Sequence, residues 1–198
     1  MEFKAFEDGI EVSGEALGAI ADGFKKYPSV AVKYLAKYGF LKSATAKLTD
    51  IDRGRWYRQQ SWLDAFAEIT REIGVNSLYA IGRGIPENAV FPEQINDIRS
   101  GIGSLDVAYH MNHRKGGAVM FNPENGQMLE GIGHYGFQPS PNENRIVCVC
   151  ENPYACDFDR GIIAAMANRF EARARTVHDN EAPCRKKGAE SCTYVTVW

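Results

Sequence analysis

Apolar residues in the first half of the chain recur at steps of three and four, which is the spacing of helices with one buried face. The clearest example is 61–73, where Trp62 and Phe66 lie on an apolar face and acidic residues take the other side. The same spacing predicts further helices over 13–24, 28–39 and 75–85, one that begins at Pro92, and one over 104–114. We expect Gly101 and Gly103 to separate the last two of these helices.

The pattern changes after Arg114 to short, β-prone segments divided by turn sequences such as Asn-Pro-Glu-Asn-Gly. These segments predict antiparallel strands at 116–121, 128–137, 145–150, 172–178 and 192–198, with one long helix at 157–170. We therefore expect an α+β fold, in which N-terminal helices pack on a C-terminal antiparallel sheet with one long helix. The whole of 1–198 is expected to be one domain, with a helical half at 1–114 and a second half at 115–198.

Composition narrows the class of protein. With 198 residues, of which 44% are hydrophobic, the chain can bury a full core without disulfides. A net charge of -2 gives no bulk attraction to nucleic acid or anionic membranes, and neither is expected as a partner. The acidic N-terminal sequence does not resemble a secretory signal, and no apolar run reaches the roughly 18 residues that a membrane-spanning helix needs. We expect a cytoplasmic protein whose five cysteines are thiols or metal ligands.

The most specific chemistry lies near the C-terminus. Cys156 opens the long helix, and three more potential ligands, Glu181, Cys184 and Cys192, gather around Gly188. Tetrahedral zinc accepts thiolates and carboxylates, and the step from Cys184 to Cys192 allows a loop whose two ends reach one ion. The alternative is a set of buried thiols that act as small hydrophobic side chains, with Glu181 in solvent. Because four protein ligands leave zinc no open position, this site would be structural, and we assign no catalytic residue.

The Asn-Pro-Tyr-Ala-Cys, Glu-Ala-Pro-Cys and Cys-Thr-Tyr motifs around these ligands resemble the 4-vinyl reductase domain family over 115–198. That family includes proteins linked to bacteriochlorophyll vinyl reduction and the sensory domains of aromatic-responsive transcription activators. The resemblance implies a small-molecule-binding fold and a zinc ion held by Cys156, Glu181, Cys184 and Cys192. His178 and Asp179 are alternatives for the fourth ligand, since a shift of one or two residues would exchange them with the glutamate.

Histidines and aromatic residues are the candidates for a ligand pocket. His110 and His113 stand three apart on a predicted helix and so share a face, where they could bind a metal, a heme or a carboxylate-bearing ligand, or form an ordinary polar patch. His134 lies beside glycines on a predicted strand, where a ligand could approach the backbone, and a role in the core is its alternative. The aromatic residues that are expected to line the pocket, or else to form ordinary core, are Trp56, Tyr57, Trp62, Phe66, Tyr79 and Tyr109. From both groups we select as ligand-binding residues His134, His110, Tyr109, Trp62 and Phe66.

Together these features predict a sensor-like domain that binds a hydrophobic or aromatic small molecule and carries a structural zinc ion. The alternative is a tetrapyrrole-binding enzyme or accessory protein of the bacteriochlorophyll 4-vinyl reductase type, which the resemblance implies. No residue of the chain can carry a hydride, so a reductase would need a separate cofactor. The sequence leaves open the identity of the ligand and the oligomeric state, a homodimer included.

Overall fold

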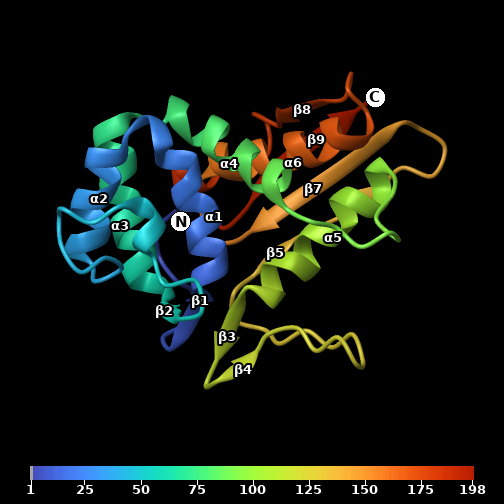
Figure 1. The fold of residues 1–198 in the computed structure, drawn as a ribbon. Coiled ribbons are helices and arrows are strands. Elements are labelled where there is room, and N and C mark those ends of the chain that lie inside the picture. The colour runs from blue at the N-terminus through green and yellow to red at the C-terminus, as the bar shows by residue number, and fades with distance from the viewer. Residues whose placement is uncertain (1) are drawn as a thin grey trace.

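Six α-helices and two antiparallel sheets make up residues 2–198, the part of the chain that the computed structural model describes, apart from the side chain of Asn88 (Figure 1). The helices are α1 (Gly14–Gly23), α2 (Pro28–Lys37), α3 (Gln59–Ile73), α4 (Asn76–Asn88), α5 (Ile98–Met111) and α6 (Cys156–Phe170). The strands are β1 (Ile10–Ser13), β2 (Trp56–Arg58), β3 (His113–Lys115), β4 (Ala118–Val119), β5 (His134–Tyr135), β6 (Gln138–Pro139), β7 (Arg145–Glu151), β8 (Arg175–His178) and β9 (Cys192–Val197). Short 3-10 turns stand at Phe24–Lys26, Leu48–Asp50 and Arg185–Lys187. The predicted α+β class is confirmed.

The helices of the first half begin and end close to their predicted positions. The side chain of Ser13 accepts a hydrogen bond from the backbone N–H of Ala16 at 3.1 Å, which satisfies a free donor at the start of α1. Pro28 opens α2, and Gly74 ends α3 with a φ of 84°, a conformation that glycine adopts without strain. The apolar face of α3 is buried as its periodicity predicts, with Trp62 and other large side chains in the core.

The two sheets occupy different parts of the molecule (Figure 1). The smaller sheet has the strand order β2-β1-β3-β4, and the larger has the order β5-β7-β9-β8, with β6 beside β7. In the larger sheet β7 and β9 pair from Arg145↔Val197 to Cys150↔Cys192. Every second residue of β7 is buried, and α6 packs on this sheet, so that Cys148 and Cys150 belong to the core.

Helix α6 is the central helix of the fold, because it contacts α4, α5, β8 and β9. It crosses α4 at two glycines that allow backbone to lie against backbone. A Cβ atom added to Gly82 would lie 2.1 Å from the carbonyl oxygen of Phe158, and one added to Gly161 would lie 2.2 Å from that of Tyr79. Side chains of α4 and α6 on either side of this crossing line the cavity described below.

Two wrong predictions about the elements concern the first half of the chain. The sequence predicts two helices separated by Gly101 and Gly103, whereas α5 runs through both glycines without a break. A Cβ atom at Gly101 would lie 2.5 Å from the ring of Phe170, so this glycine serves close packing. The predicted helical half also contains β1, β2 and β3, which are too short to give a clear alternating pattern. Within the described residues, no helix is both long enough and apolar enough to span a bilayer.

Candidate functional site

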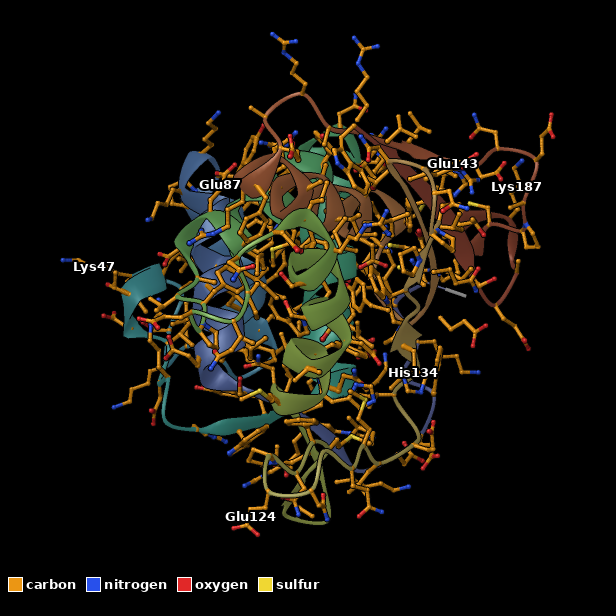
Figure 2. The ribbon with its side chains drawn as sticks, turned by 90° about the vertical axis from the view of Figure 1, so that its right-hand side faces the viewer. Lys47, Glu87, Glu124, His134, Glu143 and Lys187 are labelled. Carbon is orange, nitrogen blue, oxygen red and sulfur yellow. The ribbon has the colours of Figure 1, made fainter. Side chains whose placement is uncertain are left out.

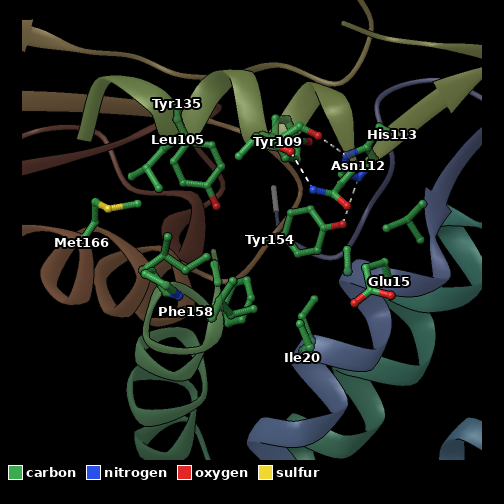
Figure 3. Close-up of a pocket in the computed structure, with 18 of the residues that line it drawn as sticks. Glu15, Ile20, Leu105, Tyr109, Asn112, His113, Tyr135, Tyr154, Phe158 and Met166 are labelled. Carbon is green, nitrogen blue, oxygen red and sulfur yellow. Dashed lines mark hydrogen bonds between the residues drawn. The ribbon is translucent and has the colours of Figure 1, made fainter. Parts of the chain in front are cut away.

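A cavity of about 480 Å³ lies between α1, α4, α5 and α6 (Figure 3). Its wall is largely apolar, with Ile20 from α1, Leu105 from α5, and Phe158, Ile162 and Met166 from α6. Polar groups come from Glu15, Tyr109, Asn112, His113, Tyr135 and Tyr154. Mostly apolar walls with a few convergent polar groups are typical of small-molecule sites.

His113 and Tyr154 form a buried polar pair in the wall of this cavity. His113 Nδ1 lies 2.7 Å from the carbonyl oxygen of Tyr109, and His113 Nε2 lies 3.1 Å from the Tyr154 hydroxyl (Figure 3). Because a carbonyl only accepts, Nδ1 carries the proton, and Nε2 accepts a hydrogen bond from Tyr154. Burial lowers the pKa of His113 to about 4, so the imidazole is neutral at physiological pH. The tyrosine oxygen keeps the capacity to accept a further hydrogen bond.

Two more polar side chains are buried beside Tyr154. Gln59 is 1% exposed, and neither its amide oxygen nor its amide nitrogen makes a hydrogen bond to a described residue within ordinary geometry. The indole nitrogen of Trp62 is likewise buried without a hydrogen-bond partner among the described residues. Both side chains are close enough to lower the pKa of Tyr154, although burial dominates and raises it overall. Buried polar groups without a partner are costly, and these two side chains belong to the core beside Tyr154, outside the cavity lining.

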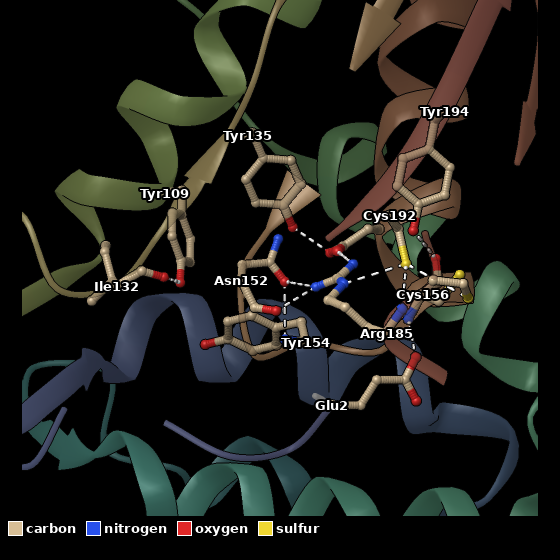
Figure 4. A network of polar contacts seen from close by, with 12 residues as sticks. Glu2, Tyr109, Ile132, Tyr135, Asn152, Tyr154, Cys156, Arg185, Cys192 and Tyr194 are labelled. Atoms are coloured by element: carbon tan, nitrogen blue, oxygen red, sulfur yellow. Dashed lines mark hydrogen bonds and ion pairs between the residues drawn. The ribbon is translucent and has the colours of Figure 1, made fainter. Parts of the chain in front are cut away.

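A second polar network leads from the cavity to the C-terminal loop (Figure 4). The Tyr135 hydroxyl donates to Asp159 Oδ1 at 2.5 Å, and Arg185 Nη2 donates to Asp159 Oδ2 at 2.5 Å. Arg185 also donates to the carbonyl oxygen and the side chain of Asn152. Its backbone N–H and its Nε both point to Cys192 Sγ, at 3.3 and 3.4 Å. One fully buried arginine thus neutralises a carboxylate and donates to a thiol.

The C-terminal cysteines come together as the sequence predicts, with a different fourth residue. One potential ligand atom from each of Cys156, His178, Cys184 and Cys192 lies within 4.8 Å of all the others. The sulfur atoms of Cys184 and Cys192 are 3.9 Å apart, close to the ~3.8 Å between two thiolates bound to one tetrahedral ion at about 2.3 Å. Hydrogen bonds from the Cys156 thiol and from Arg185 lower the pKa of Cys192, which favours the thiolate.

Glu181 is not part of this cluster. It is exposed, and its backbone N–H donates to the side chain of Asp179 at 3.0 Å. His178, which ends β8, takes its place, and its Nε2 is buried without a hydrogen-bond partner among residues 2–198. Whether Glu181 or His178 lies next to the three cysteines depends on the conformation of the chain at the end of β8 and in the loop after it, which residue spacing does not determine.

The five residues selected as ligand-binding separate into three groups. Tyr109 lines the cavity, where its hydroxyl donates to the Ile132 carbonyl oxygen at 2.7 Å. Trp62 and Phe66 are core residues with stacked rings 5.3 Å apart, outside the cavity lining. His110 and His134 also lie outside the lining and contact each other with ring centroids 4.9 Å apart.

His113 lines the cavity, although it was a candidate only together with His110 and was not among the five residues selected as ligand-binding. The predicted shared helix face of His110 and His113 does not exist, because α5 ends at Met111 and His113 opens β3. The aromatic pattern could not identify Tyr154 either, since it stands in a loop before α6. Among the aromatic residues proposed for the pocket, Trp56, Tyr57 and Tyr79 are likewise outside the lining.

Solved structures similar to this chain are H-NOX proteins. One from S. oneidensis in the Fe(II)NO ligation state has a TM-score of 0.63 and 15% identity, covering 93% of this chain and 97% of that chain. Fe(II) unliganded H-NOX protein from K. algicida has a TM-score of 0.58 and 10% identity, with 93% and 95% covered. A structure concerned with modulating heme redox potential through protein-induced porphyrin distortion has a TM-score of 0.58 and 12% identity, with 94% and 99% covered. No protein-family model and no curated protein matches the chain.

These comparisons correct the resemblance drawn from the cysteine motifs. The similar structures are H-NOX domains over nearly the whole chain, so the identification as a 4-vinyl reductase domain is wrong. The expectations that depended on it, a zinc site of that family's type and a vinyl reductase activity, lose that support. Motifs of a few residues around cysteines carried the resemblance, whereas the shared fold extends over both halves of the chain. At these sequence identities the similarity establishes the fold alone, so the ligand has to be inferred from the chemistry of the site.

Proposed function

We propose that this chain is a sensor-like binding domain whose cavity takes a neutral, mostly apolar small molecule, with an aromatic ring and one hydrogen-bond donor. The buried His113–Tyr154 pair carries the proposal. Since the Tyr154 hydroxyl donates to His113, its oxygen is free to accept from a ligand O–H or N–H group. Apolar and aromatic side chains around this acceptor suit a ring.

The cavity wall offers little to a charged ligand. Glu15 is the charged side chain of the lining, and it is 70% exposed and paired with Arg53 at 3.0 Å. An anionic ligand would meet no lysine or arginine in the wall, and a cation would leave water for a largely apolar surface. A neutral ligand avoids both costs.

A tetrapyrrole is the second candidate, because heme and its iron are named for the similar structures. The residues of this cavity, as they are arranged, do not fit heme. His113 is the histidine in the lining, and both of its ring nitrogens already have partners. The lining also lacks a cationic side chain that could pair with the carboxylates of heme. The neutral ligand is therefore the stronger candidate.

Binding of 2-naphthol and of naphthalene, measured by calorimetry, tests the proposal. One hydrogen bond to Tyr154 is worth about 1 kcal/mol, so 2-naphthol should bind about fivefold more tightly. Tyr154→Phe should remove this preference. Ala19→Phe should reduce the affinity for both compounds, because Ala19 lines the cavity, whereas Ala44→Phe, on an exposed loop outside it, should change neither.

Binding unaffected by Ala19→Phe would place the ligand elsewhere and refute the proposal. A titration with hemin distinguishes the second candidate, a tetrapyrrole, from the neutral ligand. A Soret band that persists in Tyr154→Phe and disappears in His113→Gln would identify a tetrapyrrole pocket instead.

We also propose that the cluster of Cys156, His178, Cys184 and Cys192 holds a thiophilic divalent metal ion with a structural role. The spacing of the four ligand atoms and the partnerless Nε2 of His178 support this assignment. Hydrogen bonds from Arg185 to Cys192 are the kind of outer-shell contact that stabilises a metal-bound thiolate. Four protein ligands would leave no open position, so the ion would fix the C-terminal loop against the start of α6.

A further inference from the structure

A second cluster of metal-binding side chains lies outside both the cavity lining and the thiol cluster. One potential ligand atom from each of Asp106, His110 and His134 lies within 4.8 Å of the other two. Asp106 and His110 stand one turn apart on α5, and His134 opens β5. The helix and the strand thus bring together two imidazoles and a carboxylate, although His134 is 24 or more residues away from the other two along the chain.

The tautomer of His110 suits metal binding. His110 Nδ1 lies 2.8 Å from the backbone carbonyl oxygen of Asp106, so Nδ1 carries a proton, and in the neutral imidazole Nε2 has the lone pair. The side chain is 0% exposed, and Nε2 makes no hydrogen bond to any described residue. A buried acceptor without a partner is costly, and a metal ion would satisfy it. Histidine ligands commonly donate their other N–H to a backbone carbonyl in this way.

His134 and Asp106 are held in a similarly favourable arrangement. His134 Nδ1 lies 2.9 Å from Asp106 Oδ2, and two ligands that share an ion at about 2.1 Å are ~3.0–3.4 Å apart. The other ring nitrogen of His134 lies 3.1 Å from Glu130 Oε2, so an outer carboxylate orients the ring. Asp106 Oδ1 accepts the backbone N–H of Tyr135 at 2.9 Å, which fixes the carboxylate.

We propose that Asp106, His110 and His134 bind a divalent first-row transition-metal ion, with Glu130 as the carboxylate that positions His134. Two imidazoles and one carboxylate are a ligand set that such ions accept, and three protein ligands leave open coordination positions. The side chain of His134 is 35% exposed and lies near the surface in Figure 2, which gives an ion access from solvent. The proposal does not depend on the ligand proposed for the cavity or on the ion proposed for the thiol cluster.

Cadmium-113 NMR of the metal-stripped full chain tests the proposal, because the resonance position separates thiolate-bound cadmium from cadmium bound to nitrogen and oxygen. We expect a nitrogen- and oxygen-bound resonance in addition to any thiolate-bound one. Asp106→Asn and His134→Gln should abolish the first and leave the second. Glu130→Gln should weaken binding about tenfold, as outer-shell substitutions commonly do.

Glu124→Gln is the matched control, because Glu124 is an exposed carboxylate on the loop after β4, labelled at a separate place in Figure 2. Absence of a nitrogen- and oxygen-bound resonance at saturating cadmium would overturn the proposal. A resonance that survives both Asp106→Asn and His134→Gln, or that disappears in Glu124→Gln, would do the same. The proposal can also be tested without a variant, since metal binding should shift the Nε2 signal of His110 in the imidazole nitrogen spectrum, and an unshifted signal would exclude His110.

Discussion

The crossing of α4 and α6 gives the sharpest prediction for stability. A Cβ atom in Gly82→Ala would lie 2.1 Å from the Phe158 carbonyl oxygen and 3.2 Å from the Ile162 backbone nitrogen. Ordinary contact begins at 3.4 Å, so the helices would have to separate by more than 1 Å at this point. Both neighbours are backbone atoms of α6, so a side-chain rotation cannot relieve the clash.

The expected cost follows from two opposing effects. Overpacking of a close contact typically destabilises a protein by about 1–3 kcal/mol, and alanine regains about 0.5–1 kcal/mol relative to glycine within a helix. With contact against backbone, the upper part of the first range applies, so we expect Gly82→Ala to lose about 2 kcal/mol. For a chain of this size, that corresponds to a fall in melting temperature of roughly 4–8 °C.

Gly84→Ala is the control on the same helix, because a Cβ atom there meets nothing within 4 Å. It should be neutral or stabilise the protein by up to about 1 kcal/mol. Thermal and urea unfolding of both variants is the assay, and 2-naphthol binding should also weaken in Gly82→Ala, since Phe158 and Ile162 line the cavity. If Gly82→Ala is as stable as Gly84→Ala, the close crossing of the two helices is wrong.

Two further predictions concern His113 and the thiol cluster. The folded pKa of His113, which burial lowers to about 4, lies below its ordinary value of 6.5, so its contribution to stability is complete above pH 6.5 and falls as the pH drops towards 4. Between pH 7.5 and 4.5 the wild type should therefore lose roughly 2–3 kcal/mol more than His113→Gln in urea unfolding, and equal losses would contradict the buried neutral imidazole. Cobalt added to the metal-stripped chain should give a thiolate charge-transfer band that Cys184→Ser strongly reduces and Glu181→Gln leaves unchanged, because Glu181 lies outside the cluster. A band that depends on Glu181 instead would reject His178 as the fourth ligand.

Sequence periodicity predicted the long elements that bury one face and expose the other. In α3, Trp62 and Phe66 are buried and the opposite face is solvated, so the helix was visible in the sequence. The strands β4 and β5 have two residues each, which is too few for an alternating pattern, and the predicted strands 116–121 and 128–137 are mostly loop. Pairing with distant partners determines such short strands, and a local pattern contains no information on those partners.

The thiol cluster shows a different limit of sequence reasoning. The three cysteines were identified because residue type and spacing restrict which of them can reach one ion. The fourth position was open between Glu181, His178 and Asp179, and it depends on where β8 ends. Val177 of that strand is exposed and His178 turns inward, because neighbouring residues on a strand face opposite sides. Register in the folded sheet, rather than distance along the chain, therefore brings the histidine next to the three cysteines.

The helical phase of α5 connects the cavity with the proposed two-histidine site. Residues Leu105 to Met111 lie in one unbroken run of this helix and therefore keep one helical phase. Leu105 and Tyr109, four residues apart, face the cavity, while Asp106 and His110 lie one residue further around the helix and contact His134. The same helix thus supplies part of the cavity wall with one face and part of the proposed two-histidine site with the adjacent face. Tyr135 contacts both sites, because it lines the cavity and its backbone N–H donates to Asp106. An ion that moved Asp106 would act directly on the backbone of a residue that lines the cavity.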